Sequence, residues 1–167
     1  DNIDSDASRT NGKMATFQAN KGAQKHTMMD AGLWSPGSVE AYVWDDRNGN
    51  GRQDKNEPAL SGVTVKLLES DGSTELGNTT TDGSGLARFN SVPADRPMLI
   101  QFFELDNYRF TLKDQGTNDN IDSDASRTNG KTGTFQAEEG SQVHTKMDAG
   151  LWSPGTVESY VWDDQNG

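Results

Sequence analysis

A long internal repeat is the feature that most constrains this chain. The segment 1–49 recurs as 119–167, at an offset of 118 residues (119 minus 1) and without a gap. About four fifths of the paired positions are identical, which chance does not produce. A period of this length fits a whole folded domain rather than one unit of a solenoid. We therefore interpret the chain as part of a tandem array of domains.

Proline and glycine mark the domain boundaries, at Ser35-Pro36-Gly37 and at Ser153-Pro154-Gly155. Residues 1–36 are predicted to be the C-terminal part of a preceding repeat, residues 37–152 a complete repeat, and residues 153–167 the N-terminal start of the next. Because these connections are short and stiff, we expect neighbouring repeats to keep a fairly fixed orientation.

Short β-rich runs separated by turn residues make up the complete repeat, and no run has the pattern of an amphipathic helix. Val63, Val65 and Leu67 alternate with polar residues, as a half-buried strand requires. Asp71-Gly72 and Asp82-Gly83 lie between runs and predict hairpin turns. Roughly seven or eight strands in one repeat indicate an all-β fold, an antiparallel Ig-like β-sandwich. The runs are 39–44, 63–69, 76–81, 86–90, 98–104, 108–112, 132–137 and 143–151.

The apolar residues of these runs supply the predicted core. Its members are Val39, Val43, Val63, Val65, Leu67, Phe89, Leu99, Phe103, Phe110, Phe135 and Leu151. Trp44 and Trp152 are harder to assign, because a tryptophan beside a boundary either packs against the next repeat or caps its own core. The sequence leaves both alternatives open.

The composition limits the chemistry available to the chain. With 26 acidic against 15 basic residues and a formal net charge of -11, it repels phosphate backbones, so we expect no nucleic-acid partner. The same charge suits oxygen-ligated cations, although acidity also serves solubility alone. The absence of cysteine excludes disulfides and thiolate metal sites. No stretch approaches the roughly 18 apolar residues of a membrane-spanning helix.

The segment 46–57 matches the calcium-loop pattern D-x-[DN]-x-[DN]-G-x5-E over its full length. In such a loop the side chains at positions 1, 3 and 5 converge on one ion, and the glutamate at position 12 closes the site with two oxygens. The predicted Ca²⁺ ligands are Asp46, Asn48, Asn50, the main-chain carbonyl of Arg52, Asp54 and Glu57, with Gly51 at the sharp turn. Because a strand precedes the loop, we expect no helix-loop-helix sensor. The alternative is a turn of the same residue types without metal.

A second acidic cluster comprises Asp119, Asp122 and Asp124. Alternate carboxylates along an extended chain point to one side and repel one another without a cation, so we predict a second calcium here. Asp45, Asp106, Asp114 and Asp148 are further candidate ligands on weaker grounds. The alternative is a solvated acidic loop, because this cluster does not complete a known loop consensus.

Together these motifs resemble the serine-aspartate-repeat protein B-type domain. The resemblance rests on the motif order from 43–58 through 60–68, on Thr80-Thr81-Asp82-Gly83-Ser84-Gly85, and on the closing segments 122–131 and 148–151. It implies a prealbumin-like β-sandwich, calcium in the loop 46–57, and tandem copies on a bacterial cell surface that form stalks or extracellular fibres. Related collagen-adhesin B-type domains carry a Lys–Asn isopeptide bond, but the run 39–44 contains no lysine, so we expect no such crosslink.

We expect a structural protein rather than an enzyme, because catalytic groups must gather in a pocket. The only histidines, His26 and His144, occupy one position in two copies, and a single histidine on a strand is typical of a surface residue. The predicted partners are neighbouring repeats of the same protein, in a surface stalk or filament. The alternative is an adhesin module that itself contacts protein or carbohydrate; its patch would be exposed and aromatic.

Overall fold

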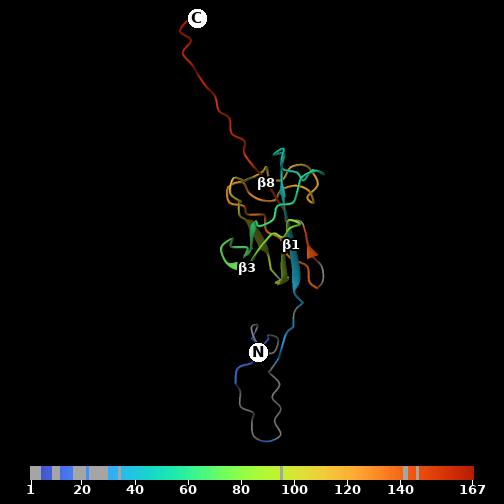
Figure 1. The fold of residues 1–167 in the computed structure, drawn as a ribbon. Helices are drawn as coiled ribbons and strands as arrows, with labels where there is room; N and C mark the ends of the chain where they lie inside the picture. Colours follow the sequence, from blue (N-terminus) through green and yellow to red (C-terminus); the bar gives the residue numbers. More distant parts are fainter. Residues whose placement is uncertain are drawn as a thin grey trace. The chain divides into compact units, whose positions relative to one another are not determined.

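The fold comes from a computed structural model, which forms two compact units, Asp1–Ser35 and Pro36–Gly167 (Figure 1). The regular structure of the described residues is all strand, and none of them forms a helix that could cross a membrane. The residues that the structure describes are 5–8, 12–16, 22, 30–33, 35–94, 96–140, 143–145 and 147–167.

The larger sheet is organised around β1 (Gly37–Asp45), which has neighbours on both sides. On one side β4 (Leu86–Val92) pairs with it in antiparallel fashion. On the other side β7 (Val143–His144) and β8 (Ala149–Trp152) both run parallel to it, along its first and last parts respectively. The sheet ends at β6 (Arg109–Phe110), which pairs with β8. β1 is therefore the central element of the domain.

The smaller sheet has β2 (Thr64–Glu69) in the middle, with β3 (Glu75–Thr80) and β5 (Met98–Phe102) antiparallel on either side. The turns at Asp71-Gly72 and Asp82-Gly83 lie between strands, as their sequences predict. The prediction of an all-β sandwich is confirmed.

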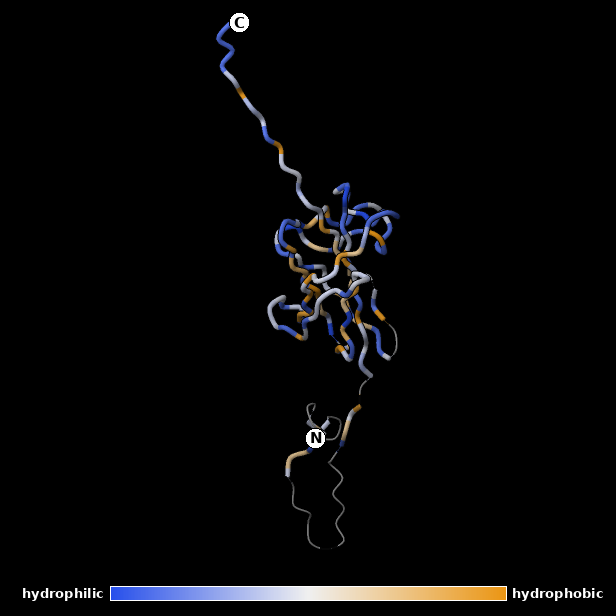
Figure 2. Tube along the Cα trace, in the orientation of Figure 1, coloured by the Kyte–Doolittle hydropathy of each residue, from blue (hydrophilic) through white to orange (hydrophobic). Residues whose placement is uncertain are grey.

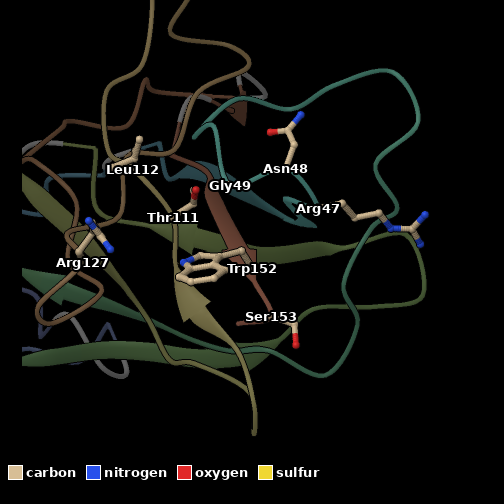
Figure 3. Close-up of a pocket in the computed structure, with 8 residues that line it drawn as sticks. All are labelled: Arg47, Asn48, Gly49, Thr111, Leu112, Arg127, Trp152 and Ser153. Atoms are coloured by element: carbon tan, nitrogen blue, oxygen red, sulfur yellow. The ribbon is translucent and has the colours of Figure 1, made fainter. Parts of the chain in front are cut away.

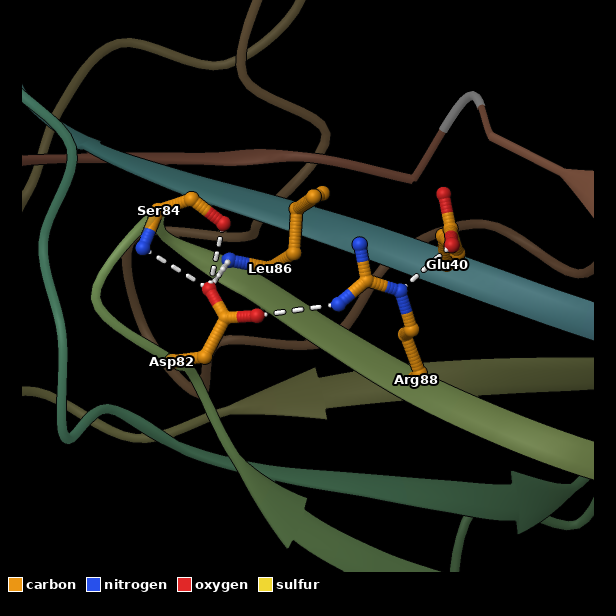
Figure 4. Close-up of polar contacts among 5 residues, drawn as sticks. All are labelled: Glu40, Asp82, Ser84, Leu86 and Arg88. Atoms are coloured by element: carbon orange, nitrogen blue, oxygen red, sulfur yellow. Dashed lines mark hydrogen bonds and ion pairs between the residues drawn. The ribbon is translucent and has the colours of Figure 1, made fainter.

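Asp82 shows how one of these turns is held (Figure 4). Its carboxylate accepts hydrogen bonds from the side chain and main chain of Ser84 and from the main chain of Leu86. Arg88 bridges it to Glu40 of β1, at 2.9 and 2.6 Å. These bonds, the Ser84 hydroxyl foremost, hold the pKa of Asp82 at about 2. The turn is thereby joined to the β1–β4 pair.

The core lies between the two sheets and contains every predicted core residue except Leu99 and Phe103. Leu99 is buried outside this cluster, and Phe103 is 37% exposed. Successive side chains of a strand point to opposite faces, and here the buried position is taken by Phe102, the last residue of β5. The ring of Phe103 instead lies under the ammonium of Lys66, at 5.7 Å.

Trp44 belongs to the core of its own domain, where it is fully buried and stacks on Tyr42. Gly150 faces it so closely that an added Cβ would lie 2.8 Å from the indole. Trp152 is only half-buried and lies where the chain leaves β8. The two alternatives left open by the sequence are thus resolved in favour of self-packing for Trp44.

Two predicted strands differ in the structure. The run 132–137 is not a strand, because it contacts β5 only through single bridges such as Met98–Phe135. The run 143–151 is divided into β7 and β8, because its middle turns Asp148 towards the main chain of Tyr42. Hydrophobic alternation predicts extended chain in both places, but continuous pairing depends on the partner strand.

The described part of the first unit repeats the hydrogen bonds of its counterpart in the domain. The Asp6 amide donates to the Asp30 carbonyl at 2.9 Å, and the Asp30 amide donates to the Asp6 carboxylate at 2.8 Å. Asp124 and Asp148, 118 residues later, form the same two bonds at 2.9 and 2.7 Å. The repeat therefore extends from sequence to local structure.

The segment 153–167 contains the sequence of β1 a second time but forms no strand. Figure 2 shows apolar positions interspersed with polar ones along it. Val157 is 95% exposed and Val161 90% exposed, whereas their counterparts Val39 and Val43 are fully buried. Identical residues thus have opposite environments, depending on whether a sandwich surrounds them.

Candidate metal-binding site

The predicted calcium loop begins directly after β1 and reverses sharply at Gly51. This glycine has a φ of +80°, and an added Cβ would lie 2.3 Å from the main-chain oxygen of Leu112. Only glycine fits a position that requires both a left-handed backbone and close approach of a neighbouring chain. The turn predicted from the loop consensus is therefore present.

Asp46, the first predicted ligand, is fully buried and anchors the loop. Its carboxylate accepts hydrogen bonds from the amides of Asn50 and Gly51, at 3.2 and 2.7 Å. It also accepts a bond from the hydroxyl of Thr111, which comes from the segment after β6. This last contact spans 65 residues, so no local sequence pattern could have identified Thr111.

Three further predicted ligands meet at one point. The side-chain amides of Asn48 and Asn50 both donate to one carboxylate oxygen of Asp54, at 2.7 and 2.9 Å. These bonds hold the pKa of Asp54 below its ordinary value. The side-chain oxygens of these two amides accept main-chain bonds instead, that of Asn48 from the Asn50 amide at 3.0 Å and that of Asn50 from the Arg52 amide at 2.7 Å.

Glu57 closes the loop upon itself. Its two carboxylate oxygens accept bonds from the amides of Arg47, at 3.0 Å, and Asp54, at 2.9 Å. Burial, with a smaller contribution from the Asp46 charge, raises the pKa of Glu57. Glu57, the last position of the consensus, thus contacts Arg47, the second position. This is the closed loop that the spacing predicts.

Main-chain bonds join the loop to the second acidic cluster. The Gln53 amide donates to the Ile121 carbonyl at 2.6 Å, and the Ser123 amide donates to the Gly51 carbonyl at 3.1 Å. Arg52, whose carbonyl is a predicted ligand, forms a β-bridge with Asp122. The two groups of predicted ligands, about 70 residues apart in the chain, therefore lie side by side.

Buried carboxylates distinguish the second cluster. Asp122 and Asp124 are almost fully buried, whereas Asp119 is exposed at the edge. Burial is the main cause that raises the pKa of Asp124 to about 7 and that of Asp148 to about 8, and the neighbouring carboxylates add to both. Asp148, a weaker candidate from the sequence, is thus part of this cluster.

One oxygen of Asp122, Oδ1, is buried without any hydrogen-bond partner in the described part of the chain. Unsatisfied buried oxygens are costly, and a bound cation is one way to satisfy them. Within the same residues, no three acidic or histidine side chains converge closely enough to hold a metal alone. A cation at this cluster would therefore need amide or main-chain oxygens as well as carboxylates.

The histidine position serves packing in the described copy. His144 is half-buried, and its ring stacks on Phe135 with 4.5 Å between centroids. Its counterpart His26 lies outside the described residues.

Comparison with known proteins agrees with this architecture. Residues 37–151 match the model of the SdrD B-like domain. The chain is 35% identical over 127 residues to serine-aspartate repeat-containing protein C of Staphylococcus aureus (strain MRSA252), which covers 75% of this chain and 13% of that protein. It is 33% identical over 130 residues to serine-aspartate repeat-containing protein F of Staphylococcus epidermidis, and this match covers 77% of this chain and 7% of that protein. The chain thus spans a small part of these relatives' length.

Among solved structures, the minor pilin GBS52 of Streptococcus agalactiae is similar in fold. The TM-score is 0.51 at 15% sequence identity, and the match covers 78% of this chain and 50% of the pilin. At that identity the likeness shows the β-sandwich fold alone. The resemblance identified from the sequence motifs is confirmed by the family match.

Proposed function

The chain belongs to the SdrD B-like domain family, and from that membership we propose that it is a calcium-stabilised module of a tandem array on a bacterial cell surface. Its role is structural: the array forms a stalk or filament outside the cell, and neighbouring repeats are the module's partners. The observation that carries the proposal is the closed loop 46–57, in which the side chains of Asn48, Asn50 and Asp54 meet and Glu57 reaches back to the amide of Arg47.

The first calcium would be held by the loop. Asp54, Asn48 and Asn50 meet at one point, and rotation of the two amides would turn their oxygens towards it. Glu57 would supply two oxygens and Arg52 its carbonyl. A bound cation stabilises ionised carboxylates that otherwise repel one another, so binding contributes directly to folding.

The second calcium would be held by Asp119, Asp122 and Asp124 together with neighbouring main-chain oxygens, because the carboxylates do not converge closely enough to hold it alone. The unpartnered Asp122 oxygen and the raised pKa values of Asp124 and Asp148 support this site, because all three reflect buried negative charge without compensation. Through the main-chain bonds to the loop, both ions would stiffen the same end of the sandwich.

The tandem arrangement is supported by the repeat itself. Residues 5–8 and 30–32 keep the local hydrogen bonds that 123–126 and 148–150 form within the domain. The segment 155–163 reproduces β1, with its apolar side chains exposed. Near-identical copies suit a spacer, because each copy of a stalk performs the same mechanical task.

The proposal is tested by the calcium content and the location of the native protein. Protein purified without chelator should contain bound calcium by elemental analysis. Protease applied to intact cells should remove it, and electron microscopy should show it on stalks or filaments. Calcium-free protein recovered only from the cell interior would contradict the proposal.

A further inference from the structure

A hollow of about 450 Å³ lies where the chain leaves β8. It is lined by the start of the loop 46–57, the segment after β6 and the end of β8. In Figure 3 the indole of Trp152 lies in the middle, with Arg127 and Arg47 to either side and Ser153 beside it. The hollow therefore combines an aromatic surface with two guanidinium groups.

The positive charge in the hollow is largely uncompensated. Arg127 is exposed, and among the described residues its guanidinium has no hydrogen-bond or ion-pair partner. Arg47 reaches only Asp45, at 3.2 Å, and its side chain is 65% exposed. Guanidinium groups pair with carboxylates and stack on aromatic rings, so this surface fits an acidic protein segment.

The repeat identifies which segment comes next to the hollow. Gly155 follows Ser153 by two residues, a distance of at most about 7 Å. It is the counterpart of Gly37, the first residue of β1. Within the described domain Gly37 lies against Glu138, since an added Cβ would be 2.4 Å from the Glu138 main-chain oxygen. The first residue of a domain is thus adjacent to that domain's own 138–139 loop.

This loop carries two acidic side chains in the described domain. Glu138 and Glu139 are both exposed. At the corresponding positions of the other copy the sequence has Asn20 and Lys21. The two copies of the sequence therefore differ in charge at positions that, in the described domain, lie beside its first strand residue, Gly37.

We propose that the hollow binds a following copy of the domain that has the sequence of residues 37–152, so that its counterparts of Glu138 and Glu139 pair with Arg127 beside Trp152. The inference rests on the proposed tandem array and identifies its joint. Individual exposed ion pairs are weak, but a two-residue tether keeps the partners at high effective concentration. Trp152 then loses its remaining exposure to the following domain, whereas Trp44 is buried in its own.

The test extends the full chain after Gly167 with the sequence of residues 50–154, because Gly167 corresponds to Gly49. The chain lacks cysteine, so Ser61→Cys and the same change in the following copy provide two unique sites for spin labels. The distance distribution between the labels should be narrow. Arg127→Glu should abolish the narrow distribution, and arginines at both acidic positions of the following copy should restore it.

Two matched controls come from the chain itself. A following copy that carries the Asn–Lys pair in place of Glu–Glu should also lose the narrow distribution. The unextended 167-residue chain with Arg127→Glu should keep its melting temperature, which excludes unfolding as the cause. The proposed contact between Arg127 and the following copy would be contradicted by a distance distribution that stays narrow in Arg127→Glu. It would also be contradicted by a distribution that is broad before any substitution. Calcium-dependent melting of the unextended chain tests the proposed function separately.

Discussion

Glu57 is the residue whose geometry most directly links sequence spacing to proposed metal binding. Eleven residues separate it from Asp46 (57 minus 46), yet its carboxylate accepts a bond from Arg47, beside the first ligand. Both of its oxygens accept bonds from main-chain amides of the loop, which fix the orientation of the carboxylate. A cation entering the loop would therefore meet a preorganised bidentate ligand.

Glu57→Gln should weaken calcium binding more than any other single change in the loop. The variant loses one negative charge and one of two ligating oxygens, and we expect the dissociation constant to rise by about ten-fold or more. Titration calorimetry on the calcium-free protein measures this. Glu139→Gln is the control, since it removes the same charge from an exposed position far along the chain and should bind normally. Equal affinities in all three proteins would show that Glu57 is not a ligand.

The buried carboxylates predict how stability depends on pH without calcium. Their folded-state pKa values, about 7 for Asp124 and about 8 for Asp148, lie above the ordinary 3.8. The folded state therefore binds protons more tightly than the unfolded state, and the free energy of unfolding falls as pH rises from about 4 to about 8. In chelator, the melting temperature should be higher at pH 5 than at pH 8.

Excess calcium should reduce the difference in melting temperature between pH 5 and pH 8, because a cation stabilises the ionised carboxylates at the higher pH. Asp148→Asn should reduce it as well, in chelator. A calcium-free protein that becomes more stable between pH 5 and pH 8 would contradict the assignment of these groups.

At the residue scale, sequence reasoning found the contacts that are local. Positions 46–57 were identified because a fixed spacing curls one short segment. The bond from Thr111 to Asp46 and the bond from the Asp148 amide to Asp124 join distant segments, across 65 and 24 residues. Such contacts depend on which strands become neighbours in the sheet, and this cannot be predicted from the individual residue types.

At the element scale, β1 has the strongest structural role, because it contacts β4, β7 and β8 at once. Its alternation of buried and half-buried residues made it easy to predict from sequence. The short strands β6 and β7 were overestimated in length, since two residues of pairing leave little periodic signal. Their registers follow from the strands they join rather than from their own sequences.

The repeated strand offers a matched pair of substitutions. Val43→Ala removes buried methyl groups from β1 and should lower the free energy of unfolding by about 2 kcal/mol. Val161→Ala changes the counterpart residue, which is 90% exposed, and should have no measurable effect. Denaturant unfolding followed by tryptophan fluorescence compares the two. A similar loss of unfolding free energy in both variants would mean that the segment 155–163 is packed as well.

At the scale of the whole molecule, one β-sandwich domain contains both groups of predicted metal ligands and is proposed to be one unit of an array. The two predicted ligand groups lie together at one end of the sandwich, near the exit of the chain. The internal repeat supports the proposal that the domain belongs to a series. In that proposal a domain without cysteine would gain rigidity from bound cations instead of disulfides, which would suit a load-bearing stalk outside the cell.

Calcium-dependent thermal unfolding of the 167-residue chain tests the central claim most directly. An ion that binds the folded loop and not the unfolded chain, as we propose for calcium, adds about 2.7 kcal/mol to the free energy of unfolding at one hundred times its dissociation constant. For a chain of this size that corresponds to a rise of roughly 5 to 10 °C in melting temperature. We expect such a rise from chelator to saturating calcium, with no comparable rise in magnesium. An unchanged melting temperature, in a protein that binds no calcium at equilibrium, would contradict it.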